Sequence, residues 1–292
     1  MTTTDEGTPA SPKRGPGRDL PAAIAVGVSL FALVVVTLIW FHPGFIALLV
    51  LLTSAGAIEL HHALRRVGMT SAIVPVVIGN TVIIGGTYAA AEFQKQTNVP
   101  WHVVLLGAIG GTVLVALIGR MFGGASGYVR DSAASLFVIG YVPLLASFIG
   151  LILAQDNGVG KVVAVLLCVV GSDTGGYVVG ATLGRHQMAP MISPKKTWEG
   201  LAGSFALAIV VGTLHTVLFM GDPWWQGVIL AVIVVVFGTA GDLIESLIKR
   251  DVGIKDMSSI LPGHGGVMDR LDSTLLAGPA AWVLFTLAGV LG

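Results

Sequence analysis

Long apolar stretches separated by short polar segments dominate this sequence. Nine stretches can be distinguished, and each is close to the roughly 20 residues that a helix needs to cross a bilayer core of about 30 Å. Their apolar positions do not alternate with period two, so they predict helices and not strands. The stretches cover approximately residues 21–41, 44–64, 69–91, 101–120, 132–154, 159–181, 199–220, 224–248 and 271–291. The pattern therefore predicts an all-α polytopic membrane protein with about nine transmembrane helices.

The segments around these stretches predict how the chain is organised. Residues 1–19 are rich in Thr, Pro, Gly and charge, a composition typical of a disordered tail. The tail does not match a signal peptide, because the apolar stretch after it is too long and lacks a small-residue cleavage site. We expect N-terminal transmembrane helices at 20–155 and a C-terminal, catalytic transmembrane region at 156–292, which holds most of the unusual polar sequence.

The basic residues predict the orientation in the membrane. Cytoplasmic segments of membrane proteins carry an excess of Lys and Arg. If the N-terminus is cytoplasmic, all 16 Lys and Arg residues except Lys95 and Lys161 fall on the cytoplasmic side. An even number of spans would break this partition. We therefore expect nine spans in the cell (inner) membrane, with a cytoplasmic N-terminus and an external C-terminus.

Composition narrows the possible functions. Only 11% of the residues are charged, whereas a soluble domain carries about 25%. The net charge is zero, so no basic field indicates a nucleic-acid partner. The single cysteine, Cys168, lies in an apolar stretch and excludes both an intrachain disulfide and a cysteine-cluster metal site.

The densest polar sequence lies at the end of the eighth stretch and the start of the ninth. Four side chains there are spaced to share one face of a helix, with apolar residues on the other face: Asp242, Glu245, Ser246 and Lys249. Asp269 and Asp272 repeat this spacing in the ninth stretch. Ionisable groups in membrane segments cost about 2.5–3.5 kcal/mol each on insertion scales and are usually functional. Neighbouring carboxylates need a cation between them, and oxygen ligands without a His/Cys cluster favour Mg²⁺.

Basic and glycine-rich sequence accompanies these acids. Lys249, Arg250, Lys255 and Arg270 suit phosphate oxygens. The turn Pro262–Gly266 can present backbone N–H groups to an anion, and its His264 could contact phosphate or transfer a proton. Carboxylates, a divalent ion and basic residues together favour phosphoryl or nucleotidyl transfer. The alternative is a cluster of internal salt bridges at the inner leaflet. Lys249 and Arg250 lie at the cytoplasmic end of their helix, where losing a charge costs little, so replacing either by Ala should weaken substrate use without abolishing membrane insertion.

Two further segments carry candidate binding residues. Asp173 lies well inside the sixth stretch among glycines spaced by four, which predicts close helix packing. It could form a wall of a polar cavity or simply bond to a neighbouring helix. The loop at 184–200 contains groups that suit phosphate, and Thr197 is a candidate cap for the seventh helix. Those groups are Ser193, Lys195, Lys196 and Thr197. The alternative for this loop is a positive cytoplasmic segment without a site.

The N-terminal half offers little chemistry. One short polar cluster lies at the inner end of the second stretch: Glu59, His61, His62, Arg65 and Arg66. We interpret it as an anchor at the membrane interface. A role at the functional site is the alternative.

Together, the three C-terminal segments resemble the phosphatidate cytidylyltransferase family. That family's signature runs Ser-x-x-Lys-Arg-x4-Lys-Asp and then Pro-x-His-Gly-Gly-x-x-Asp-Arg-x-Asp. Every fixed position is filled here, by Ser246, Lys249, Arg250, Lys255, Asp256, Pro262, His264, Gly265, Gly266, Asp269, Arg270 and Asp272. The segment 193–200 is similar to the family's internal motif. The element at Asp173, Thr174 and Tyr177 also matches, although Gly176 stands where the family more often has Ala. The resemblance covers about 171–272.

The resemblance implies a nine-helix homodimer whose polar cavity opens to the cytoplasm and the inner leaflet. It implies attack of the phosphatidic acid phosphate on the α-phosphorus of CTP, with Mg²⁺ as cofactor and K⁺ as a second ion. Catalytic roles fall on Asp242, Lys249, Arg250, His264 and Asp269, with Asp242, Asp269 and Asp272 as metal ligands. Substrate binding falls on Asp173, Ser193, Lys195, Lys196, Thr197, Ser246, Lys255, Gly265, Gly266 and Arg270.

Two other classes of function stay open at the level of sequence. One is a related CTP-dependent lipid enzyme, such as a CDP-archaeol synthase or a polyprenol kinase. The other is an ion-coupled transporter that uses Asp173 and Asp242 as coupling carboxylates. No inverted repeat is visible, and the polar motifs gather in one half of the chain and on one side. These observations favour the enzyme.

Overall fold

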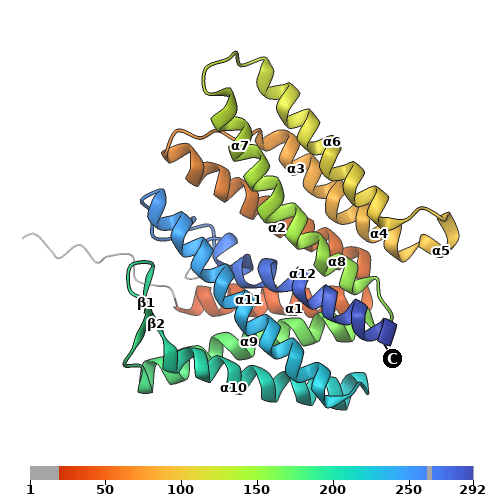
Figure 1. The fold of residues 1–292 in the computed structure, drawn as a ribbon, viewed down its shortest axis with the longest axis vertical. Coiled ribbons are helices and arrows are strands. Elements are labelled where there is room, and N and C mark those ends of the chain that lie inside the picture. The colour runs from red at the N-terminus through yellow and green to blue at the C-terminus, as the bar shows by residue number, and fades with distance from the viewer. Residues whose placement is uncertain (1–19, 262–264, 292) are drawn as a thin grey trace, which may run out of the picture.

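The computed structural model describes residues 20–261 and 265–291, and most of this chain is helical. Each of the nine predicted stretches is a helix or an interrupted helix (Figure 1). Within the described residues, eight helices are long and apolar enough to cross a membrane, and the apolar part described in the first helix, Ala25–Trp40, is shorter. The all-α polytopic fold is therefore confirmed, and the count of nine spans stays a prediction. The predicted tail at 1–19 lies outside the described residues.

The helices follow one another with short connections. The N-terminal half contains α1 (Leu20–Trp40), α2 (His42–Arg66), α3 (Ile73–Thr81), η1 (Val82–Gly86), α4 (Thr87–Glu92), α5 (Gln94–Thr97), α6 (Trp101–Met121), α7 (Tyr128–Ile139), η2 (Gly140–Leu144) and α8 (Leu145–Leu153). The C-terminal half contains α9 (Gly158–Leu183), α10 (Trp198–His215), η3 (Thr216–Met220), α11 (Trp224–Asp251) and α12 (Met268–Leu291). In Figure 1, α12 passes between α2 and α8 above and α9 and α10 below, and it packs on α2 and α8. The two halves thus form one packed bundle.

Local irregularities occur in three of the spans. The π-helical segments η1 and η2 lie between α-helical parts, and η3 ends the span that begins with α10. In η2 the cause is visible in the sequence, because Pro143 lacks a backbone N–H and its ring clashes with the carbonyl four residues earlier. The interruption places the Tyr141 ring, which is almost fully buried, in the interior of the bundle.

Small residues let α9 and α10 approach closely, as the glycine spacing predicted. A side chain on Gly175 would overlap the backbone carbonyl of Gly203 on the facing helix. Glycine is therefore required at this crossing, since only a residue without Cβ permits that backbone approach. The close contact fixes the wall from which Asp173 projects.

A β-hairpin connects α9 to α10, and the sequence analysis did not predict it. The strands β1 (Gln187–Ala189) and β2 (Ser193–Thr197) pair antiparallel in the segment that was expected to be a loop. The backbone N–H of Trp198 donates to the carbonyl of His186 and closes the hairpin base at 3.0 Å. Thr197 caps α10 as predicted, accepting the Gly200 N–H on its hydroxyl at 3.1 Å. Proline content and short length had concealed the strands.

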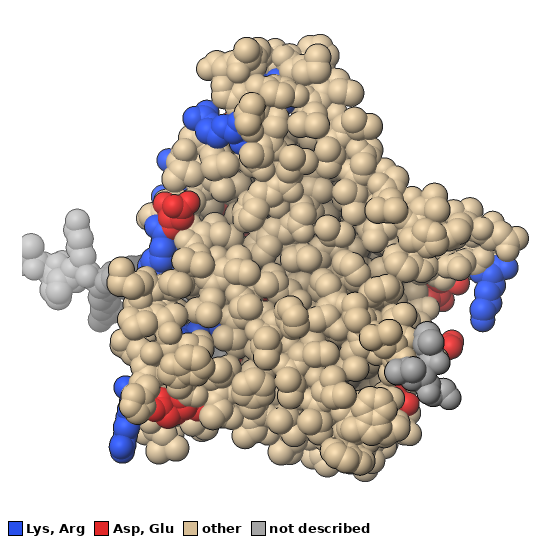
Figure 2. Space-filling model, in the orientation of Figure 1, with Lys and Arg blue, Asp and Glu red and all other residues tan. Residues whose placement is uncertain are grey.

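Charged residues gather at opposite ends of the molecule. On the face in Figure 2, most charged side chains lie at the left and right margins, with a broad uncharged surface between them. The left margin in Figure 1 carries the hairpin, and the right margin carries α5 and the C-terminus. This arrangement suits a bilayer around the middle, with its two aqueous faces at the margins.

The topology gives a first testable prediction. Cysteines introduced at Met191, on the hairpin, and at Lys95, in α5, should react with a membrane-impermeant maleimide from opposite sides of oriented vesicles. Both side chains are exposed, and the natural Cys168 is fully buried and should give little background. The hairpin cysteine should react from the side of the N-terminus. Labelling of both positions from the same side would contradict the nine-span arrangement.

Candidate active site

A cavity of about 330 Å³ lies where β2, α9, α10, α11 and the first turns of α12 meet. It collects six of the predicted site residues: Asp173, Ser193, Lys195, Lys196, Thr197 and Asp242. Its other lining residues are Ser172, Gly176, Tyr177, Met188, Gly200, Leu201, Ser204, Gly238, Thr239 and Ser273. Segments distant in the sequence therefore form one polar cavity within a mostly apolar bundle.

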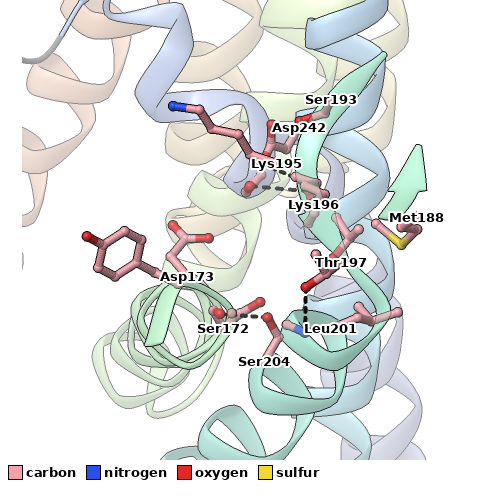
Figure 3. Close-up of a pocket in the computed structure, with 16 residues that line it drawn as sticks. Ser172, Asp173, Met188, Ser193, Lys195, Lys196, Thr197, Leu201, Ser204 and Asp242 are labelled. Carbon is pink, nitrogen blue, oxygen red and sulfur yellow. Dashed lines mark hydrogen bonds and ion pairs between the residues drawn. The ribbon is translucent and has the colours of Figure 1, made fainter. Parts of the chain in front are cut away.

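An ion pair crosses this cavity. The Lys196 ammonium on β2 lies 2.5 Å from a carboxylate oxygen of Asp242 on α11, so it ties the hairpin to the bundle (Figure 3). In Figure 3, the Asp173 carboxylate points from α9 toward the part of the cavity where Lys195 and Asp242 lie. Lys195 and Lys196 bring positive charge to a cavity that is also lined by the carboxylate residues Asp173 and Asp242. Such a site can bind a polyphosphate together with a cation.

Several small hydroxyl residues in the cavity were missed by the sequence analysis. Ser204 on α10 donates to the backbone carbonyl of Ser172 at 2.7 Å, and both line the cavity. Thr239 precedes Asp242 by three residues and therefore shares its helix face, a signal that the sequence did contain. Ser273 directly follows Asp272. Ser204 had no such signal, because its place depends on how α10 packs against α9.

A second polar cluster lies beside the cavity, between α11 and α12. The Lys249 ammonium forms ion pairs with Glu245 and, at 2.8 Å, with Asp269. The Lys249 side chain is only 13% exposed and that of Glu245 only 1%. The predicted polar face of α11 does point inward. The expectation that losing the Lys249 charge costs little is wrong, because this lysine is buried between two acids. Its proposed contact with phosphate stays a prediction.

Asp269 organises the loop that precedes α12. One of its oxygens accepts the Gly266 N–H at 2.7 Å and the Met257 N–H at 3.2 Å, and the other takes Lys249. Gly265 has φ +83°, as the predicted turn requires, and exchanges backbone hydrogen bonds with Leu261. The backbone N–H groups of Gly265 and Gly266 therefore have acceptors within the chain, so the expectation of a free anion nest at these two groups is wrong. Pro262, Gly263 and His264 lie outside the described residues.

The remaining predicted residues lie around these two centres. Arg250 donates through Nε to the carbonyl of Ile192 at 3.3 Å and so contacts the hairpin. Lys255 is exposed, and Ser246 is half-buried on α11. Arg270 lies in the first turn of α12. Within the described chain these four do not line the cavity itself.

The fit of these residues to a metal ion rests on Asp272 and its neighbours. Asp272 is buried, accepts the N–H of Ser273 at 2.7 Å, and lies within electrostatic range of Asp242 and Asp173. The buried Oε1 of Glu245 has no hydrogen-bond partner among the described groups. No three His, Cys, Asp or Glu side chains converge on one point in the part of the chain that the structure describes. Mg²⁺ usually takes one or two carboxylates and completes its shell with substrate phosphates and water. The donor set therefore fits an ion that arrives with a nucleotide.

One N-terminal residue was misjudged. Glu59 on α2 is only 2% exposed and accepts hydrogen bonds from the loop before α12. The favoured interpretation of Glu59 as an interfacial anchor is therefore wrong. Nearby, the His61 ring nitrogen contacts the Ser71 hydroxyl at 2.7 Å, which is a structural contact within the N-terminal half.

Comparison with known proteins decides the family. A model of the cytidylyltransferase family matches residues 21–288. The chain belongs to the cytidylyltransferase family. The match includes the N-terminal half, in which the sequence analysis found no motif.

Curated relatives of this cytidylyltransferase-family chain carry a more specific name. It is 36% identical over 317 residues to a phosphatidate cytidylyltransferase from Mycobacterium bovis, which covers 98% of this chain and 99% of the relative. It is 39% identical over 290 residues to the phosphatidate cytidylyltransferase of Mycobacterium leprae, covering 93% and 89% of the two chains. The Bacillus subtilis phosphatidate cytidylyltransferase is 37% identical over 158 residues, 51% of this chain and 59% of the relative. The similarity to the mycobacterial proteins thus extends over nearly the full length.

Proposed function

We propose that this chain is a phosphatidate cytidylyltransferase, which transfers the cytidylyl group of CTP to phosphatidate and so contributes to phospholipid biosynthesis. The observation that carries the proposal is a cavity lined by two lysines and two carboxylate residues, placed in a membrane bundle of the cytidylyltransferase family. The products are CDP-diacylglycerol and pyrophosphate. Its full-length similarity to the mycobacterial relatives supports this substrate pair over a related CTP-dependent lipid enzyme.

The reaction needs charge neutralisation and alignment more than proton transfer. An oxygen of the phosphatidate phosphate forms a bond to the α-phosphorus of CTP, and the bond from that phosphorus to the bridging oxygen of pyrophosphate breaks. The nucleophile is already anionic, so a general base is dispensable. Lys195 and Lys196 are placed to neutralise phosphate oxygens, while the hydroxyls of Ser193 and Thr197 can donate hydrogen bonds to them. Rigid walls then hold the two phosphates in line.

Mg²⁺ belongs to this proposal, with Asp242, Asp269 and Asp272 as its candidate ligands. When bound, the ion supplies positive charge to the crowded phosphates and to the leaving pyrophosphate. Asp242 is best placed because it lines the cavity, and Asp272 directly precedes Ser273, which also lines it. Asp269 retains lone pairs beyond its three hydrogen bonds and borders the same region. K⁺ as a second ion follows from the family resemblance alone.

Placement and assembly complete the proposal. We place the hairpin side and the N-terminus in the cytoplasm, because Lys and Arg are concentrated there and CTP is a cytoplasmic nucleotide. A homodimer in the inner membrane follows from the family resemblance. Its test is the mass of the detergent-solubilised protein, measured by light scattering with the detergent contribution subtracted.

Two labelled forms of CTP test the chemistry. Purified protein with phosphatidate and Mg²⁺ should incorporate label from the α-phosphate into lipid and release the γ-label as pyrophosphate. A matched preparation of Asp242→Asn protein controls for enzyme carried over from the host. Lipid labelled only from the γ-phosphate would overturn the proposal in favour of a lipid kinase. If no divalent metal supported lipid labelling, the result would favour the transporter hypothesis.

A further inference from the structure

Glu59 is a buried carboxylate that lies in the N-terminal half yet contacts the C-terminal site. It projects from α2 and is 2% exposed. Its Oε1 accepts the Ser258 hydroxyl at 2.5 Å and the Val267 N–H at 2.9 Å, and its Oε2 accepts the Met268 N–H at 2.8 Å. All three donors lie in the loop before α12 or at the helix start. Each carboxylate oxygen is therefore engaged with one segment of the active-site region.

These contacts cap α12 from another helix. The first N–H groups of a helix lack partners within it, and the helix N-terminus carries a partial positive charge. Glu59 supplies both acceptors and a negative charge at this end. Asp269, in the first turn of α12, takes the preceding N–H of Gly266. Two carboxylates, one local and one from α2, thus share the donors of a single turn.

The same turn explains the second glycine of the Gly265-Gly266 pair. A Cβ on Gly266 would lie 2.7 Å from the Glu59 Oε2 and 3.0 Å from the Asp269 Oδ2. Any side chain would therefore separate the two carboxylates from this backbone. The glycine is required because both acids approach the turn, and this packing links the position of Asp269 directly to Glu59.

We propose that Glu59 is a positioning residue of the active site, an inference that rests on the proposed function. It holds Ser258, Val267 and Met268 so that Asp269 faces Lys249 and the cavity region. The N-terminal half then supplies a part of the catalytic architecture as well as membrane spans. In the described part of the chain, the hydrogen bonds of Glu59 go to residues that do not line the cavity, so its effect passes through the loop and the first turn of α12.

Turnover separates a positioning role from a merely structural one. Glu59→Ala should lower kcat about 10- to 100-fold, the range typical when a residue that orients catalytic ligands is removed. Glu59→Gln should retain more activity, since its amide oxygen can still accept hydrogen bonds from Ser258 and Val267. Only the bond from the Met268 N–H is lost, because the amide NH₂ group cannot accept it. The matched control is Asn80→Ala: Asn80 is also buried and bonds to α2 through Val50, Thr53 and Ser54, and none of its hydrogen bonds reaches the described part of the loop.

A second readout needs no catalysis. A cysteine introduced at Met257, a buried position in the loop, should react several-fold faster with maleimide when Glu59 is Ala and at the original rate when Asn80 is Ala. The inference would be overturned if labelling were unchanged and the two alanine variants lost activity and thermal stability equally. Glu59 would then be an ordinary core residue. Faster labelling in a protein that makes no CDP-lipid would refute the proposed function while upholding the role of Glu59 in holding the loop.

Discussion

Replacing Asp242 by Asn is expected to lower turnover by about 100- to 1,000-fold, the effect typical of removing one electrostatic group from a catalytic site. The substitution preserves shape and removes the charge that faces Lys196 across the cavity. Asp242 is partly exposed to the cavity, so the folded state should survive. Asp269→Asn should cause a similar loss. An amide has one acceptor oxygen, so it cannot accept from Lys249 on one side and from the Gly266 and Met257 N–H groups on the other.

The measurement is CDP-lipid formation by purified protein across a range of Mg²⁺ concentrations. Asp251→Asn is the matched control, since Asp251 is an exposed acid at the end of the same helix, α11. Its activity should stay at the wild-type level. If Asp242→Asn or Asp269→Asn retained wild-type turnover at limiting Mg²⁺, that residue could not be a metal ligand.

The second large effect concerns stability. Lys249→Met should destabilise the folded protein by about 3–5 kcal/mol, the usual result of removing one partner from a buried ion pair. Glu245 and Asp269 would then be left close together without the lysine that pairs with both of them. Adding Glu245→Gln to Lys249→Met should recover much of the loss, because it removes one of the two unpaired charges.

Arg250→Met provides the control for that experiment. It removes the same charge from the adjacent, exposed position, where the guanidinium only reaches the Ile192 carbonyl. Thermal unfolding in detergent should place this variant near the wild type and the Lys249→Met variant well below it. Equal unfolding temperatures for the two variants would show that the buried cluster does not stabilise the bundle.

The features of this fold that depend on residues close together in the sequence could be predicted from the sequence. Apolar length predicted the helices, and a spacing of three and four residues predicted the inward face of α11 with Asp242, Glu245 and Lys249. Thr197 was identified as a cap because it is a threonine just before the seventh apolar stretch, and its partner, Gly200, lies only three residues away. These contacts are local, so periodicity and residue type are sufficient to find them.

Contacts between distant segments could not be found in that way. Glu59 acquires its function from Val267 and Met268, and nothing in the second apolar stretch indicates those partners. The hairpin depends on the pairing of two very short strands around a proline-containing turn. The free N–H groups expected at Gly265 and Gly266 are taken by Leu261 and Asp269, which only the folded loop reveals.

The bond between Glu59 and Met268 also has a consequence for biogenesis. The two residues are separated by 209 positions, so at ordinary rates of translation Glu59 emerges roughly 10–40 s before its partner. During that interval the Glu59 carboxylate on α2 lacks the backbone partners that it has in the folded protein. The contact that Glu59 makes from α2 is therefore completed only when the start of α12 has been synthesised. A nascent chain that stops before residue 267 can contain most of the membrane spans and still lack an assembled catalytic centre.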